Sequence, residues 1–132
     1  MPTKAQAIGL TEAHVQQTVT QSLELDGWRA IRTEHAIERN TKGAFKRKVG
    51  EVGMPDYLYV RYGPTGNDPD ESADRAMYTQ ALWIEFKKPG EKPSYDQLVW
   101  HEMERKRGAL VMVFDSIESF KVWYAASGLQ RR

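Results

Sequence analysis

The chain has 132 residues, 19 of them basic and 18 acidic, for a formal net charge of +1. This length fits one domain, residues 1–132, that can bury a core without disulfides or a structural metal. The absence of cysteine excludes zinc–thiolate sites, iron–sulfur clusters and cysteine nucleophiles. The balanced charge excludes a uniformly basic nucleic-acid-binding surface. With no apolar run of about 18 residues and no basic-then-apolar leader, we expect no membrane partner.

The first half of the chain predicts a helix followed by strands. Thr11 can cap a helix over 11–26, in which Val15, Val19 and Leu23 recur at four-residue spacing before Gly27. Residues 28–33 predict a short strand, and 34–54 an irregular loop or hairpin. Residues 57–62 are rich in β-forming side chains, and the glycines and prolines of 63–69 interrupt the chain.

The second half predicts a strand–helix–strand unit and a last helix. Residues 81–87 predict a strand. Ser94 and Gln97 form a capping-box pattern before a helix that Gly108 ends. The apolar run 109–114 predicts a strand buried on both faces. Asp115 or Ser116 then begins a helix that ends at Gly128. The fold class is therefore α/β: a small mixed β-sheet flanked by helices, in which the strand–helix–strand unit is parallel and right-handed.

Two carboxylates and a lysine converge in this arrangement. Glu85 and Lys87 project from one face of their strand, because side chains alternate along a strand. If the strands over 57–62 and 81–87 form a hairpin, we expect Tyr62 to pair near Ala81 and Asp56 near Lys87. Two neighbouring carboxylates suit a hard divalent cation such as magnesium, with the backbone carbonyl of Phe86 as a further ligand. Such a cation polarises a phosphoryl oxygen and helps to generate hydroxide, while a lysine stabilises developing charge.

These residues occur in a recognisable order. The segments Gly53-Met54-Pro55-Asp56 and Ile84-Glu85-Phe86-Lys87 resemble the PD-(D/E)XK nuclease signature. The glycine before Pro-Asp, the Lys88-Pro89-Gly90 stretch and the Ser94-x-x-Gln97 pattern resemble the VRR-NUC branch, the virus-type replication-repair nucleases. The resemblance covers about residues 11–124 and implies a restriction-endonuclease-like αβββαβ core.

The resemblance also implies site residues and a substrate. Asp56 and Glu85 would bind Mg²⁺ or Mn²⁺, Lys87 would be catalytic, Gln97 would lie near the site, and Glu12 matches an acidic metal-ligand position in the first helix. Stand-alone relatives are similar to homodimeric resolvases of four-way DNA junctions, in which two active sites cut two symmetric strands. We therefore expect a homodimeric, structure-specific DNA endonuclease of the bacterial or phage-infected cytoplasm, with no nucleotide cofactor.

Several residues have both a structural and a functional interpretation. Gln97 is explained by the capping box alone, and Glu12 by the helix dipole alone. Tyr95 and Lys88 flank the motif and are candidate DNA contacts. An acid-free basic segment precedes the Pro-Asp motif and is expected to contact phosphates; its residues are Arg39, Lys42, Lys46, Arg47 and Lys48. By contrast, the chain's histidines lack metal-ligand spacing, and we interpret His14, His35 and His101 as structural or surface residues. Trp100, Trp123 and Phe120 are expected in the core.

Alternatives to a junction resolvase remain open. The same site could serve a nuclease of flaps, splayed arms or free ends. A DNA-binding module that has lost catalysis is a different class, and the intact set of Asp56, Glu85 and Lys87 argues against it.

Overall fold

The computed structural model describes residues 11–33, 50–63 and 79–131 of the chain. Its elements follow the order expected from the sequence, and the basic segment 39–48 and most of the loop 63–80 lie outside the described residues. None of the described helices is long and apolar enough to cross a membrane. The elements are α2 (Glu12–Leu25), β1 (Arg29–Arg32), β2 (Tyr57–Tyr62), β3 (Thr79–Phe86), α3 (Tyr95–Lys106), β4 (Leu110–Phe114) and α4 (Ile117–Ser127).

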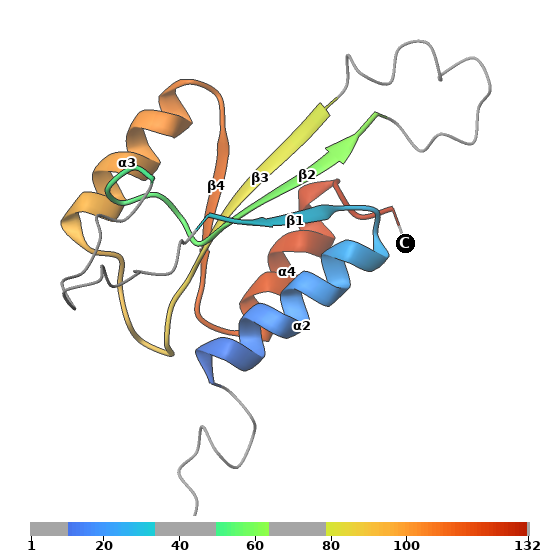
Figure 1. Ribbon diagram of the computed structural model, residues 1–132. Coiled ribbons are helices and arrows are strands. Elements are labelled where there is room, and N and C mark those ends of the chain that lie inside the picture. Colours follow the sequence, from blue (N-terminus) through green and yellow to red (C-terminus); the bar gives the residue numbers. More distant parts are fainter. Residues whose placement is uncertain (1–10, 34–49, 64–78, 132) are drawn as a thin grey trace, which may run out of the picture.

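The four strands form one mixed sheet in the order β1-β2-β3-β4. The pairs β1–β2 and β2–β3 are antiparallel, whereas β3 and β4 are parallel and joined through α3. Helices α2 and α4 lie together on one side of the sheet, and α3 lies on the other (Figure 1). The predicted α/β class, with a small mixed sheet flanked by helices, is confirmed.

The apolar core fills the space between the sheet and the α2–α4 layer. Every second residue of β3 enters it, and Leu82, Ile84 and Phe86 are buried there. Helix α2 contributes the predicted stripe of Val15, Val19 and Leu23, and α4 contributes Phe120 and Tyr124. Because strand side chains alternate, the residues between these β3 positions, Trp83 and Glu85, face α3.

The predicted caps are present. Ser94 and Gln97 form a complete capping box at the start of α3, and Ser116 caps α4. Gly108 and Gly128 follow the two helices in left-handed conformations, with φ of +100° and +80°. Local sequence signals therefore determined these helix ends.

Three sequence-based expectations are wrong in detail. The hairpin pairs Tyr62 with Thr79 and Tyr57 with Ile84, two residues from the predicted register, because β3 begins at Thr79 rather than at residue 81. Strand β4 is not buried along its length: Leu110 is 38% exposed, because β4 lies at an edge of the sheet. Trp100 is half-buried against Trp83 on the α3 side, outside the main core.

Candidate active site

The structure places Asp56 and Glu85 beside each other where β2 begins and β3 ends. Continuing the register of Tyr57 and Ile84 by one residue sets Asp56 opposite Glu85, rather than opposite Lys87 as predicted. The backbone N–H of Phe86 donates to Oδ2 of Asp56 at 3.2 Å. Paired residues share a face of the sheet, so both carboxylates are on the α3 side. The two predicted metal ligands are therefore neighbours across the ladder.

A tight turn before Asp56 fixes this position. The backbone N–H of Thr33 donates to the carbonyl of Asp56 at 2.9 Å, and its hydroxyl donates to the carbonyl of Pro55. Within the turn, the N–H of Met54 donates to the carbonyl of Glu51. Thr33, which directly follows β1, therefore anchors the Pro-Asp turn, a role that its sequence position did not indicate.

The same turn packs against the first turn of α3, which explains the glycine of the motif. Gly53 has φ of +85°, and a Cβ built there would lie 2.2 Å from the carbonyl oxygen of Asp96. No side chain fits at that distance. A second link joins the two segments, because Nε1 of Trp100 donates to Oε2 of Glu51 at 2.7 Å. The turn carrying Asp56 and the helix carrying Gln97 are thus held together.

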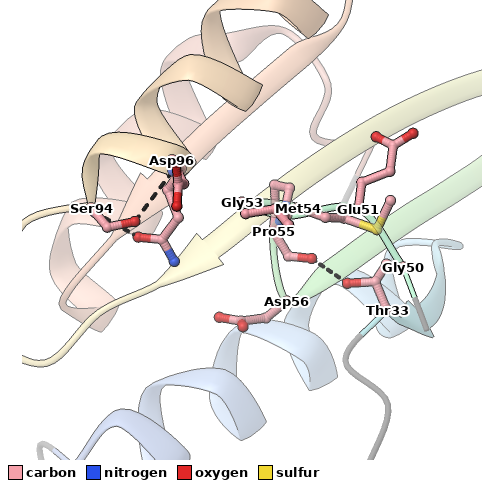
Figure 2. A pocket seen from close by; sticks show the side chains of 11 residues that line it. Thr33, Gly50, Glu51, Gly53, Met54, Pro55, Asp56, Ser94 and Asp96 are labelled. Carbon is pink, nitrogen blue, oxygen red and sulfur yellow. Dashed lines mark hydrogen bonds between the residues drawn. The ribbon is translucent and has the colours of Figure 1, made fainter. Parts of the chain in front are cut away.

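A pocket of about 350 Å³ opens between these segments. Figure 2 shows Asp56 on one side of it, and on the other side Ser94, the N-cap of α3, and Asp96 in the helix. It is lined mainly by the turn and by the start of α3: Thr33, Gly50, Glu51, Val52, Gly53, Met54, Pro55, Asp56, Ser94, Asp96 and Gln97. Polar groups therefore converge on a space next to the paired carboxylates.

Gln97 has both of the roles considered from the sequence. Its Oε1 accepts from the backbone N–H of Ser94 at 2.8 Å, and its own N–H donates to the Ser94 hydroxyl at 3.2 Å. It also lines the pocket with Asp56. Because the cap uses Oε1, the amide NH₂ is the group that Gln97 can offer to an anionic ligand.

Lys87 follows β3 directly and is largely buried. Its backbone N–H donates to the carbonyl of Phe114 at 3.0 Å, which ties the end of β3 to β4. Its Nζ lies 3.6 Å from Oε1 of Glu91, and the two side chains are 11% and 47% exposed. That distance is an ion pair without hydrogen-bond geometry. Sequence reasoning missed Glu91, although its i, i+4 spacing from Lys87 and the turn-forming Pro89-Gly90 between them were visible.

His101 is the second residue that sequence reasoning underestimated. Its Nε2 lies 3.7 Å from Oε1 of Glu85, and both side chains are almost completely buried. Burial lowers the pKa of His101, and the positive charges of Arg105 and Lys87 lower it further. Its spacing of four residues from Gln97 places both side chains on one face of α3. That spacing was a signal that His101 faces the site.

The remaining predicted residues lie outside this cluster. Glu12 is in the first turn of α2, where Oε1 accepts from Nε2 of Gln16 at 3.3 Å. Lys88 is exposed, and Tyr95 is 79% exposed at the start of α3. His14 is a surface residue, as expected. The predicted DNA contacts Arg39, Lys42, Lys46, Arg47 and Lys48, with His35, fall in a range for which no structure is described.

Within 11–33, 50–63 and 79–131, no group of three or more His, Asp or Glu side chains is arranged to hold a metal ion. The paired carboxylates of Asp56 and Glu85 nevertheless have the chemistry that Mg²⁺ and Mn²⁺ prefer, since such ions take few protein oxygens and keep several waters. The metal roles of Glu12 and of the Phe86 carbonyl stay predictions.

Comparison with known proteins bears on the fold. No protein-family model matches the sequence, and neither does any curated protein. The structure is similar to a solved structure described as "VRR_NUC domain", with a TM-score of 0.60 and 24% sequence identity. The likeness covers 86% of this chain and 94% of that one. The resemblance read from the motifs is therefore confirmed as a shared fold.

Proposed function

We propose that this chain, which has the fold of a VRR_NUC domain, is a metal-dependent DNA endonuclease. The observation that carries the proposal is the juxtaposition of Asp56 and Glu85 across the ladder. Asp56 accepts from the N–H of Phe86, the residue after Glu85, and it lines a polar pocket. In the reaction, water attacks phosphorus, one P–O ester bond breaks, and a phosphate monoester and a free hydroxyl remain. This hydrolysis needs no nucleotide cofactor.

Each residue of the cluster has a defined task in this proposal. Asp56 and Glu85 would hold Mg²⁺ or Mn²⁺, which would supply Lewis acidity and a more acidic water. Lys87, whose Nζ lies 3.6 Å from Oε1 of Glu91, would donate its ammonium N–H groups to a phosphoryl oxygen. Gln97 would orient the phosphate through its amide NH₂. Lys88, Tyr95 and the basic segment 39–48 would contact the DNA backbone.

We further propose a homodimer that cuts branched DNA. Support comes from the outer face of α3, which exposes large apolar side chains that a second copy of the chain could cover. Leu98, Val99 and Met103 are between 40% and 55% exposed there. Sedimentation should show a dimer, and Leu98→Lys combined with Met103→Lys should convert it to a monomer. A monomeric wild type would contradict the dimer without affecting the nuclease proposal.

The decisive experiment is cleavage of end-labelled DNA. The wild type should cut a four-way junction faster than linear duplex in Mg²⁺ or Mn²⁺, and EDTA should abolish cleavage. Asp56→Asn, which keeps the shape of the side chain, is the matched inactive control. Equal or faster cutting of flaps, splayed arms or free ends would favour that alternative. Binding without cleavage in any metal would favour a DNA-binding module, and cleavage in EDTA would contradict the metal mechanism.

A further inference from the structure

His101 has an environment that its packing does not explain. Its side chain is 1% exposed, on the inward face of α3, yet among the described residues neither ring nitrogen has a hydrogen-bond partner. Buried polar atoms without partners are rare in native proteins, because each costs the free energy of its lost hydration. A leucine of similar volume would fill the same space without that cost. The histidine is therefore unfavourable for packing and needs another explanation.

The imidazole is aimed at a proposed metal ligand. Nε2 lies 3.7 Å from Oε1 of Glu85, a few tenths of an ångström beyond hydrogen-bond distance. Trp100 packs edge-on against the ring, with centroids 6.4 Å apart, and so limits its orientation. An imidazole N–H donates hydrogen bonds, and Oε1 of Glu85 is the acceptor in front of Nε2.

We propose that His101 is a positioning residue that holds Oε1 of Glu85 through its Nε2–H and so fixes the carboxylate for the divalent cation. The inference rests on the proposed metal-dependent function. Nε2–H of His101, which lies 3.7 Å from Oε1, would hold that oxygen while the carboxylate binds the cation. Groups that hold metal ligands in this way commonly change metal affinity by about 10–100-fold when they are replaced.

The test measures metal binding without DNA or catalysis. Mn²⁺ is titrated into the full chain at one fixed pH, and free Mn²⁺ is followed by electron paramagnetic resonance. His101→Leu should weaken Mn²⁺ binding about 10–100-fold. His101→Gln, whose amide N–H reaches about as far as Nε2, should stay within a few-fold of the wild type. His14→Gln, at an exposed histidine on α2, is the matched surface control.

A second readout separates positioning from simple packing. Without metal, the thermal midpoint of His101→Leu should equal or exceed that of the wild type, since an unpartnered buried polar group is removed. A packing role would lower the midpoint and leave the affinity of the folded protein unchanged. Equal Mn²⁺ affinity of His101→Leu and wild type would overturn the inference, as would equal losses in His101→Leu and His101→Gln.

Two further results of Mn²⁺ binding would also decide the role of His101. Nitrogen hyperfine coupling from directly coordinated imidazole in bound Mn²⁺ would overturn the positioning role, because His101 would then itself be a ligand. If the wild type binds no Mn²⁺, both the metal-dependent function and this inference fail. If the wild type binds Mn²⁺ and cuts DNA while His101→Leu binds equally well, only the inference fails.

Discussion

Two pairs of buried charged or titratable side chains lie on opposite faces of the sheet, and among the described residues their basic members, Arg61 and His101, differ in how completely they are hydrogen-bonded. On the α2–α4 face, Arg61 and Asp26 form an ion pair at 3.3 Å. On the α3 face, Glu85 and His101 are 3.7 Å apart. All four side chains are almost fully excluded from water. Their burial is thus alike, and the difference is in their partners.

Both members of the Arg61–Asp26 pair have several hydrogen-bond partners. Arg61 donates to the Asp26 backbone carbonyl, to Gln80 and to the carbonyl of Leu129, and its guanidinium lies 4.3 Å from the centre of the Trp28 ring. Asp26 also accepts from the Tyr124 hydroxyl and the Arg131 N–H. This network joins the end of α2, strand β2 and the C-terminal segment. Its completeness is what a structural role requires.

The His101 side of the other pair has no such set of partners among the described residues. In native structures ordered water, a ligand, an ion or a substrate completes such a deficit. The contrast teaches that burial of charge does not by itself indicate function. Incomplete hydrogen bonding next to a pocket is the more informative signal.

The largest expected effect is on activity. Glu85→Gln should lower metal-dependent cleavage by several orders of magnitude, because a neutral amide is a poor ligand for Mg²⁺. Its thermal midpoint should not fall, since the amide removes the desolvation cost of a buried carboxylate. Cleavage assays measure the loss of activity, and thermal melts measure the midpoint. A variant that loses both properties would make Glu85 a structural residue, like Asp26.

Arg61→Leu should show the reverse of Glu85→Gln: it should lower stability and leave the activity of the folded protein unchanged. It leaves Asp26 buried without its cation, and breaking a buried pair in this way costs about 3–5 kcal/mol of unfolding free energy. Cleavage at low temperature should persist in proportion to the folded fraction. Urea unfolding measures the loss, with the exposed Arg29→Leu on β1 as the control. A loss no greater than the ~1 kcal/mol typical of a surface pair would mean that the network is not structural.

The network also predicts a response to alkaline pH. Burial, together with the hydrogen bond to Asp26, raises the pKa of Tyr124 to about 12. A folded pKa above the unfolded value of 10 means that its stabilising contribution is complete below pH 10. The contribution is lost as the pH rises from 10 to about 12, and each unit corresponds to about 1.4 kcal/mol.

Urea unfolding at several pH values checks this prediction. Tyr124→Phe should be less stable at neutral pH and should show a shallower decline above pH 10. Equal slopes for the variant and the wild type would place the alkaline sensitivity elsewhere, for example at Tyr59, whose pKa is also raised by burial.

The smallest effect concerns the cap that holds Gln97. Ser94→Ala should cost about 1 kcal/mol of stability, as loss of an N-cap typically does. Ser116→Ala, at the equivalent cap of α4, is the matched control and should cost about the same. Only the first should also slow cleavage, because Gln97 lines the pocket. Equal cleavage by both variants would show that the capping box has no part in catalysis.

The sequence by itself determined the elements, the fold class and the motif. Helix ends followed from Thr11, Ser94 and Gly128, because capping depends on residues within one turn of each other. The strand at 57–62 was predicted to the residue. Alternation along β3 correctly separated Glu85 from the buried Phe86 on its other face. Each of these properties is local, and local backbone geometry determines it.

Only the tertiary structure decided the partners of these residues. The hairpin register depended on where β3 begins, and a displacement of two residues moved Glu85 opposite Asp56. The contact of Gly53 with Asp96 joins positions 43 residues apart in the chain, so no local pattern could reveal it. His101 and Glu85 lie close together because the β3–α3–β4 crossover packs one face of α3 onto the sheet. Contacts of this kind depend on the packing of whole elements, whose geometry no local sequence pattern reveals.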